Sequence, residues 1–166
     1  MSGLIPIPEN EDARIEALYS HDLLDTPTEG SFNALTRLAA RVFSVPMALV
    51  SLVDRERQWF KSAHGLDTEE TPRSISFCTY AIMQPDPLVV LDALEDDRFK
   101  DTPLVTGPPN IRFYAGAPLI DKKGFRLGTF CVIGTKPRKE FLGFERNHLI
   151  DFAATTTELI QIRDAT

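Results

Sequence analysis

The stretch that decides the fold runs from Asn110 to Thr135 and reads NIRFYAGAPLIDKKGFRLGTFCVIGT. Two apolar runs flank the polar, glycine-containing segment DKKG at 121–124, a pattern that predicts a β-hairpin. Alternate residues are apolar on both sides of each run. In the first run, one face carries Ile111, Phe113, Ala115, Ala117 and Leu119, and the other carries Tyr114 and Gly116. In the second run, one face carries Leu127, Thr129, Cys131 and Ile133, and the other carries Phe130 and Val132. Because a strand that is apolar on both faces is covered on both, we expect this hairpin at the centre of a three-layer domain.

The composition fits one domain with a sizeable core, since the chain has 166 residues of which 43% are hydrophobic. No apolar run approaches the ~20 residues of a membrane span. The N-terminal sequence MSGLIPIP lacks the basic start and long apolar core of a signal peptide. We therefore expect a cytoplasmic protein with no membrane partner. The net charge is -6, and no cluster of Lys and Arg interleaves with aromatic residues, which argues against a nucleic-acid partner.

Periodicity and turn residues predict the remaining elements. The sequence TPTE at 26–29 combines a capping Thr, a Pro at the first helical position and a Glu that reaches back, which predicts the start of a helix. The buried face of this helix is predicted from the spacing of Phe32, Leu35, Leu38, Ala39, Val42 and Phe43. The other expected elements are helices over 11–20, 77–83 and 144–162, a hairpin over 47–53 and 58–63, a short strand at 88–91, a polar loop at 65–75 and irregular backbone at 101–110.

With its predicted elements in this order, the chain resembles the GAF domain family. It is most similar to the GAF domains at the N-termini of bacterial sensor histidine kinases and diguanylate cyclases. The segments that carry the resemblance are LDTP at 24–27, VSLVD at 50–54, RQWFK at 57–61, TPR at 71–73, SFC at 76–78, DRF at 97–99, GPP at 107–109, IRFYAGAPL at 111–119 and LGT at 127–129. The resemblance covers residues 9–163 as a single GAF domain, with an extended lead-in at 1–8 and a short tail at 164–166.

The resemblance implies an α+β fold with three layers. A central antiparallel sheet of five to six strands carries the terminal helices on one face, and short helices and loops cover a ligand pocket on the other. Here that cover corresponds to residues 76–83 and 92–110. The implied function is regulatory and not enzymatic: a domain of a bacterial signal-transduction protein that senses an unidentified small molecule and transmits its state through the terminal helices. Neither the ligand nor any cofactor is identified by the sequence.

Ten residues are candidates for the lining of this pocket: Trp59, Phe77, Cys78, Ala81, Asp92, Phe99, Arg112, Phe113, Tyr114 and Thr129. Arg112 would offer a fork to a carboxylate or phosphate if its strand face looks into the cavity. We favour the alternative that Arg112 reaches solvent or pairs with Asp92 or Asp97. Trp59 equally fits packing under a helix, and Asp92 equally fits capping of a turn that leads to Phe99. No catalytic or metal-binding residue is predicted.

The two cysteines, Cys78 and Cys131, have neither Cys-x-x-Cys nor zinc-site spacing, and we expect buried, reduced thiols. The family's cyclic-nucleotide pattern is not found, and Cys78 is followed by Thr79 instead of the His common at bilin attachment sites. One group of GAF-like proteins reduces free methionine sulfoxide with cysteines. That alternative would require Cys78 and Cys131 to act as nucleophile and resolving thiol.

The last helix spaces Leu149, Phe152, Thr156 and Leu159 close to a heptad seam. We therefore expect a homodimer through the N- and C-terminal helices, with a kinase or cyclase effector following in a longer protein. A ligand-free dimerisation or protein-interaction module is the alternative to ligand sensing.

Overall fold

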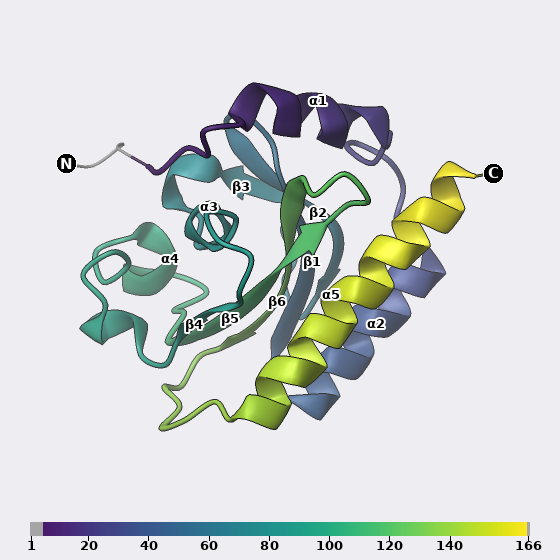
Figure 1. Ribbon diagram of the computed structural model, residues 1–166. Helices are drawn as coiled ribbons and strands as arrows, with labels where there is room; N and C mark the ends of the chain where they lie inside the picture. Colours follow the sequence, from purple (N-terminus) through teal and green to yellow (C-terminus); the bar gives the residue numbers. More distant parts are fainter. Residues whose placement is uncertain (1–4, 166) are drawn as a thin grey trace.

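A six-stranded antiparallel sheet separates two apolar layers of the molecule (Figure 1). The computed structural model describes residues 5–165, so residues 1–4 of the predicted lead-in and residue 166 of the predicted tail lie outside the described residues. The strands, in their order across the sheet, are β3 (Glu70–Pro72), β2 (Arg57–His64), β1 (Met47–Val53), β6 (Arg126–Gly134), β5 (Phe113–Ile120) and β4 (Leu88–Val90). The predicted hairpins form β1–β2 and β5–β6, and β1 pairs with β6 at the centre of the sheet.

The long helices and the short helices cover opposite sides of the sheet. Helices α2 (Gly30–Val42) and α5 (Gly143–Asp164) run side by side over one face, while α1 (Glu11–Ser20) crosses the end of the sheet (Figure 1). The other face is covered by η1 (Arg73–Ile75), α3 (Cys78–Ala81), η2 (Ala93–Glu95) and α4 (Pro103–Thr106). This arrangement confirms the predicted α+β fold.

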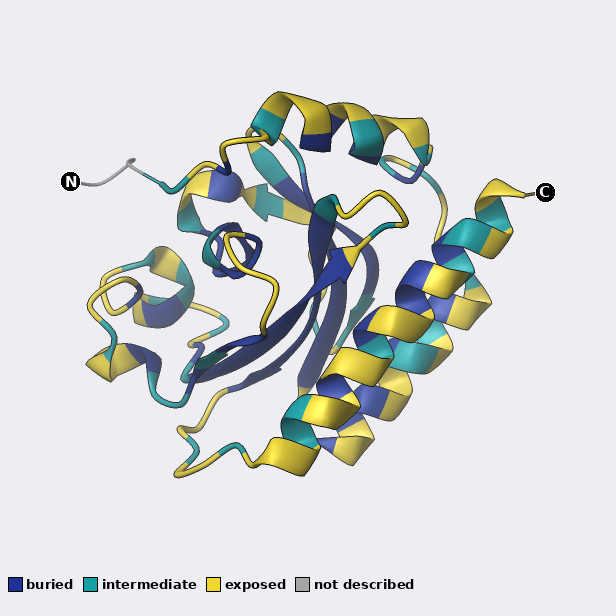
Figure 2. Cartoon of the chain, viewed as in Figure 1, coloured by how far each residue is buried: buried dark blue, intermediate teal, exposed yellow. Residues whose placement is uncertain are grey.

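Alternation along the central hairpin sends side chains into two separate clusters. Phe113, Ala115 and Phe130 pack with the long helices, whereas Tyr114 and Cys131 belong to the cluster under the short helices. The central strands are buried almost throughout (Figure 2), as their two apolar faces predict.

Two apolar residues of this hairpin lie on the side opposite to the predicted one. Ile111 precedes β5, and it packs in the cluster of Tyr114 instead of that of Phe113. Leu127 packs with the long helices because the register of β5 and β6 shifts between Leu119 and Ile120. Such an irregularity turns the side chain of the affected strand residue to the other face.

Helix α2 begins later than its sequence predicts, because a buried lysine binds the segment before it. The ammonium of Lys61, whose side chain is 0% exposed, donates to the Thr26 hydroxyl at 2.8 Å and the Pro27 carbonyl at 2.6 Å, and lies 2.6 Å from the Glu29 carboxylate. A buried ammonium is costly unless it is paired. Residues 26–29 therefore remain outside the helix and supply these oxygens, and the predicted capping box at Thr26 is wrong.

Three short elements form where the sequence predicts irregular backbone: β3 and η1 within 65–75, and α4 within 101–110. β3 is a short edge strand that pairs with β2 and ends at Pro72. The predicted strand at 88–91 forms as β4, and the predicted helix at 77–83 shortens to α3. On α2, Leu38 and Val42 were expected in the buried stripe but are 44% and 47% exposed.

Candidate ligand pocket

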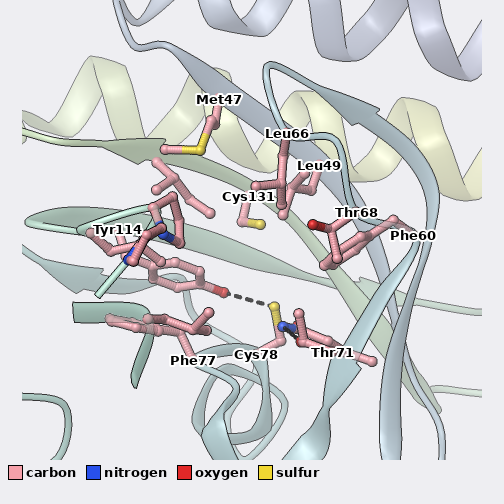
Figure 3. Close-up of a pocket in the computed structure, with 16 residues that line it drawn as sticks. Met47, Leu49, Phe60, Leu66, Thr68, Thr71, Phe77, Cys78, Tyr114 and Cys131 are labelled. Carbon is pink, nitrogen blue, oxygen red and sulfur yellow. Dashed lines mark hydrogen bonds between the residues drawn. The ribbon is translucent and has the colours of Figure 1, made fainter. Parts of the chain in front are cut away.

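A cavity of about 100 Å³ lies between the sheet and the short helices (Figure 3). Its inner part is formed by strand residues of β1, β2, β5 and β6 and by the start of α3, and its outer part by loops. The lining consists of Met47, Leu49, Gln58, Phe60, Leu66, Thr68, Thr71, Phe77, Cys78, Leu104, Pro108, Pro109, Ile111, Tyr114, Cys131 and Ile133. Tyr114, Cys78 and Cys131 are buried, whereas Thr68 and Pro108 are exposed. The cavity therefore opens toward solvent on the side of Thr68 and Pro108.

The lining lacks acidic and basic side chains. Within residues 5–165, none of the side chains that line the cavity belongs to Asp, Glu, Lys or Arg. The Gln58 amide is held in place, because its Oε1 accepts hydrogen bonds from the Ser51 and Ser76 hydroxyls and its Nε2 donates to Thr71. The polar groups at the wall are thus hydroxyls, thiols and one fixed amide, which suit an uncharged ligand with one or two polar atoms.

Tyr114 reaches along its strand to the Cys78 thiol. The Tyr114 Oη lies 3.3 Å from the Cys78 Sγ, and the Thr129 Oγ1 lies 3.0 Å from the same sulfur (Figure 3 shows the former contact). The ring passes over Gly116, where an added Cβ would stand 2.2 Å from the Tyr114 Oη. The absence of a side chain at position 116 is therefore what allows Tyr114 to reach Cys78.

The buried thiols differ in their tendency to ionise. Burial opposes ionisation of Cys78, but hydrogen bonds from Cys131, Thr129, Tyr114 and Ser51 outweigh it and lower the pKa of Cys78 to about 6. Burial and the adjacent Cys78 sulfur raise the pKa of Cys131 well above its ordinary value. Burial, together with the same sulfur, also raises the pKa of Tyr114 well above its ordinary value. The cluster thus favours one thiolate, at Cys78, surrounded by neutral donors.

Aromatic stacking fixes the cavity wall on the side of α3. The rings of Phe77 and Phe99 stack at 4.0 Å between centroids, and Tyr80 meets Phe99 edge-on at 5.0 Å. Phe77 also packs against Tyr114, with centroids 5.0 Å apart. Phe99 therefore supports Phe77 from behind and is not itself part of the lining.

The structure brings three of the ten predicted pocket residues, Phe77, Cys78 and Tyr114, to the cavity surface. Thr129 lies directly behind Cys78, and Ala81, like Phe99, packs in the cluster around the cavity without lining it. These residues form the wall and its immediate support.

The other four predicted residues lie away from the cavity. Trp59 and Phe113 pack with the long helices, because each alternates with a residue that faces the cavity. Asp92 caps η2 by accepting a hydrogen bond from the Leu94 N–H at 3.1 Å. The Arg112 Nη1 donates to the carbonyls of Val105, at 2.9 Å, and Ile111, at 3.0 Å. Arg112 thus secures α4 by main-chain contacts, in place of the predicted solvent exposure or pairing with Asp92 or Asp97.

Sequence reasoning missed most of the lining. Met47, Leu49 and Phe60 alternate with residues that face the helices, so strand periodicity marks them once the orientation of Tyr114 is known. The outer residues Thr68 and Pro108 come from loops whose sequence has no periodic signal. Among the described residues no helix is long and apolar enough to cross a membrane, and no group of His, Cys, Asp and Glu could hold a metal ion.

Comparison with known proteins identifies the family. The model of the family described as GAF domain matches residues 27–162. The chain belongs to the GAF domain family. The GAF domain of an Acinetobacter phosphoenolpyruvate-protein phosphotransferase superimposes with a TM-score of 0.67 at 14% identity, over 92% of this chain and 94% of that one. A type II free methionine-R-sulfoxide reductase from Thermoplasma acidophilum gives a TM-score of 0.64 at 12% identity, over 80% and 91% of the chains. At these identities, the two likenesses show a shared fold.

A curated relative changes one prediction. The chain is 44% identical over 133 residues to a cyclic di-GMP phosphodiesterase of Pseudomonas aeruginosa, and the match covers 80% of this chain. The expectation of a protein without enzymatic activity is contradicted by this relative, which is named as an enzyme. The chain spans 23% of the relative's length, so the likeness concerns the GAF part of that enzyme.

Proposed function

We propose that this chain is the sensory GAF domain of a bacterial signalling enzyme of cyclic di-GMP metabolism, and that its cavity binds a small uncharged molecule. The 44% identity to a cyclic di-GMP phosphodiesterase supports the signalling context. The cavity on the sheet face opposite the long helices, whose lining has no Asp, Glu, Lys or Arg side chain, is the observation that carries the proposed ligand class.

The side chains of the lining argue that the molecule bound in the cavity is not cyclic di-GMP itself. Cyclic di-GMP carries two phosphate charges, and proteins bind phosphates with Arg, Lys or clustered N–H donors. The lining described above has no cationic side chain. Its volume of about 100 Å³ is also below the ~300–1,000 Å³ of pockets for drug-sized ligands. The ligand in this proposal is therefore a molecule of a few heavy atoms.

Buried arginines connect the cavity wall to α1. The Thr79 hydroxyl of α3 donates to the Arg73 carbonyl at 2.8 Å, and the Arg73 guanidinium binds the Glu11 carboxylate at the start of α1. On α1, Arg14 also binds Glu11, at 2.8 Å. A displacement of α3 by a ligand would thus move η1 and α1 with it, which is the physical continuity that coupling between two sites requires.

A second contact completes the connection through the sheet. The Arg14 Nη1 donates to the Arg126 carbonyl at 3.2 Å, and the Arg126 Nη1 donates to the Ile82 carbonyl, just after α3, at 3.1 Å. Helix α1 is therefore attached to both ends of α3, through η1 and through β6. In the proposed function, α1 reports the state of the cavity to the rest of the enzyme.

We also propose that the chain forms a homodimer, and the exposed groove between α2 and α5 supports this proposal. Leu38 and Val42 of α2 and Phe152 of α5 line this groove, whereas Leu149 and Thr156 of the predicted heptad seam are buried within the domain. Two copies that place these grooves together would form a bundle of four helices with apolar contacts at its centre. The contact would thus use α2 together with α5, and of the predicted seam it would include Phe152 but neither Leu149 nor Thr156.

The ligand proposal is tested by thermal unfolding against a panel of small metabolites, half of them uncharged. A compound at about 100 times its Kd stabilises a protein by about 2.7 kcal/mol, or about 5–10 °C in Tm at this size. We expect such shifts from uncharged compounds, and their loss in a Thr68→Trp variant that blocks the cavity mouth. Thr135→Trp, at an exposed position outside the lining, is the matched control. A panel without any shift would favour the ligand-free dimerisation module.

A further inference from the structure

The only two cysteines of the sequence, Cys78 and Cys131, meet at the wall of one cavity. Cys78 is the first residue of α3 and Cys131 lies in the middle of β6, yet both side chains are directed into the same space (Figure 3). Both thiols are free, and the two residues are 2% and 0% exposed. Ligand sensing, as proposed above, has no need of a pair of thiols at this place.

The surroundings of the two sulfurs are polar within an otherwise apolar layer. The Cys78 Sγ lies 3.0 Å from the Thr129 hydroxyl and 3.3 Å from the Tyr114 hydroxyl. The Cys131 side chain lines the same cavity from β6 (Figure 3). Hydroxyl donors around a buried sulfur stabilise its thiolate, which is the nucleophilic form of cysteine. Cys131, in contrast, stays protonated beside it.

We propose that Cys78 and Cys131 form a redox site that a small hydroperoxide converts into an intramolecular disulfide. The Cys78 thiolate attacks the outer oxygen of the hydroperoxide, the O–O bond breaks, and the leaving alkoxide (hydroxide, for hydrogen peroxide) takes a proton from solvent to become an alcohol (water). Cys78 is then a sulfenic acid, and the peroxide has been reduced. The Cys131 sulfur next attacks the Cys78 sulfur, the S–O bond breaks, and the Cys131 proton leaves with the hydroxyl group as a molecule of water.

The cavity itself provides the route for the oxidant. A hydroperoxide is small and uncharged, like the ligand class that the lining favours, and the cavity opens to solvent beside Thr68 and Pro108. The disulfide would form at the cavity wall and attach α3 covalently to β6. Oxidation would thereby remove two polar groups from the pocket and fix the wall that a ligand must move.

The test is a count of thiols in the unmodified protein. Reduced protein is treated with hydrogen peroxide, denatured in an alkylating agent and weighed by mass spectrometry. We expect both cysteines to escape alkylation, the mass of the chain to fall by two hydrogen atoms, and dithiothreitol to restore both thiols. Because the chain has no other cysteine, an intramolecular disulfide in this experiment has one assignment.

Variants separate the roles of the two residues. Cys131→Ser is expected to stop at the Cys78 sulfenic acid, which dimedone captures, and Cys78→Ser to stay reduced. Tyr114→Phe removes one hydroxyl donor and is expected to slow oxidation about tenfold, the value of one charge-assisted hydrogen bond. Circular dichroism confirms the folding of each variant, and the count on unmodified protein remains decisive if one fails to fold.

Three outcomes would overturn the proposal: two alkylated thiols after peroxide treatment, oxidation of Cys78→Ser as fast as that of the unmodified protein, or a disulfide that joins two chains. None of them bears on whether the reduced domain binds a small molecule, so this site and the proposed function stand or fall separately.

Discussion

Arg73 and Glu11 form an ion pair that joins the wall of the cavity to helix α1. The Arg73 side chain is 1% exposed and that of Glu11 is 13% exposed. Glu11 also binds the buried Arg14, so one carboxylate neutralises two buried guanidinium groups. Among the described residues, the Arg73 Nε is the one buried side-chain nitrogen or oxygen without a hydrogen-bond partner. We therefore expect the loss of Glu11 to lower the free energy of unfolding and to weaken the coupling between the cavity and α1.

Removal of the shared carboxylate should destabilise the fold. Glu11→Gln leaves Arg14 and Arg73 buried without a counter-charge, which costs about 3 kcal/mol by comparison with other broken buried pairs. Urea unfolding measures this loss in the free energy of unfolding. Glu16→Gln, at an exposed position of the same helix, is the control and should change the free energy by less than about 0.5 kcal/mol. Equal unfolding midpoints for the two variants would contradict this role of Glu11.

The same carboxylate predicts how stability depends on pH. Burial opposes ionisation of Glu11, but hydrogen bonds from Arg73 and Arg14 outweigh it, so its pKa lies below the ordinary value of 4.5. Its contribution to stability is therefore complete above pH 4.5 and is lost as the pH falls through the lower pKa of the folded state. Urea unfolding across this acidic range should show a steeper loss of stability for the unmodified protein than for Glu11→Gln. If the free energies of unfolding of the two proteins fell in parallel with pH, a group other than Glu11 would cause the acid sensitivity.

Gly116 should be intolerant of any side chain. An alanine Cβ would stand 2.2 Å from the Tyr114 Oη, and a rigid ring packed against Phe77 has little room to withdraw. We expect Gly116→Ala to lower the free energy of unfolding by about 1–3 kcal/mol and to slow alkylation of Cys78 near neutral pH. Gly30→Ala, where an added Cβ meets nothing within 4 Å, is the control and should be neutral or slightly stabilising. Unchanged stability of Gly116→Ala would show that Tyr114 moves freely.

A charged side chain in the groove between α2 and α5 should prevent formation of the proposed homodimer. Leu38 is 44% exposed in this groove, and a carboxylate there would be desolvated in the proposed dimer. Sedimentation equilibrium should therefore find a dimer for the unmodified protein and a monomer for Leu38→Glu. Leu94→Glu makes the same change at a site of 47% exposure in η2, on the opposite side of the sheet, and should remain dimeric. A monomeric unmodified protein at high concentration would reject the dimer.

The sequence predicted the scaffold better than the site, for a physical reason. Burial leaves a periodic trace, so the apolar alternation around Phe113 and Cys131 located the central hairpin. The sequence does not indicate which face of that hairpin meets the cavity, because both faces are apolar. Trp59 and Phe113 were assigned to the pocket while Phe60 and Met47 were missed for this reason.

Polar contacts between residues far apart in the sequence could not be predicted either. The start of α2 depends on Lys61, which follows Thr26 by a whole helix and a strand and overrides a strong local capping signal. Arg112 is held by main-chain carbonyls, which carry no sequence information at all. The outer lining at Thr68 and Pro108 comes from loops, where no hydrophobic period exists.

The proposed function requires that occupancy of the cavity is transmitted to α1. Hydrogen exchange measured by mass spectrometry, with and without the uncharged compound that gives the largest thermal shift, tests it most directly. We predict that binding changes the exchange of amides in both α3 and α1, and that in Glu11→Gln the change in α1 is smaller, because only the contact through Arg14 and Arg126 still joins α1 to α3. Binding that alters exchange around the cavity of the unmodified protein but leaves α1 unchanged would exclude this transmission.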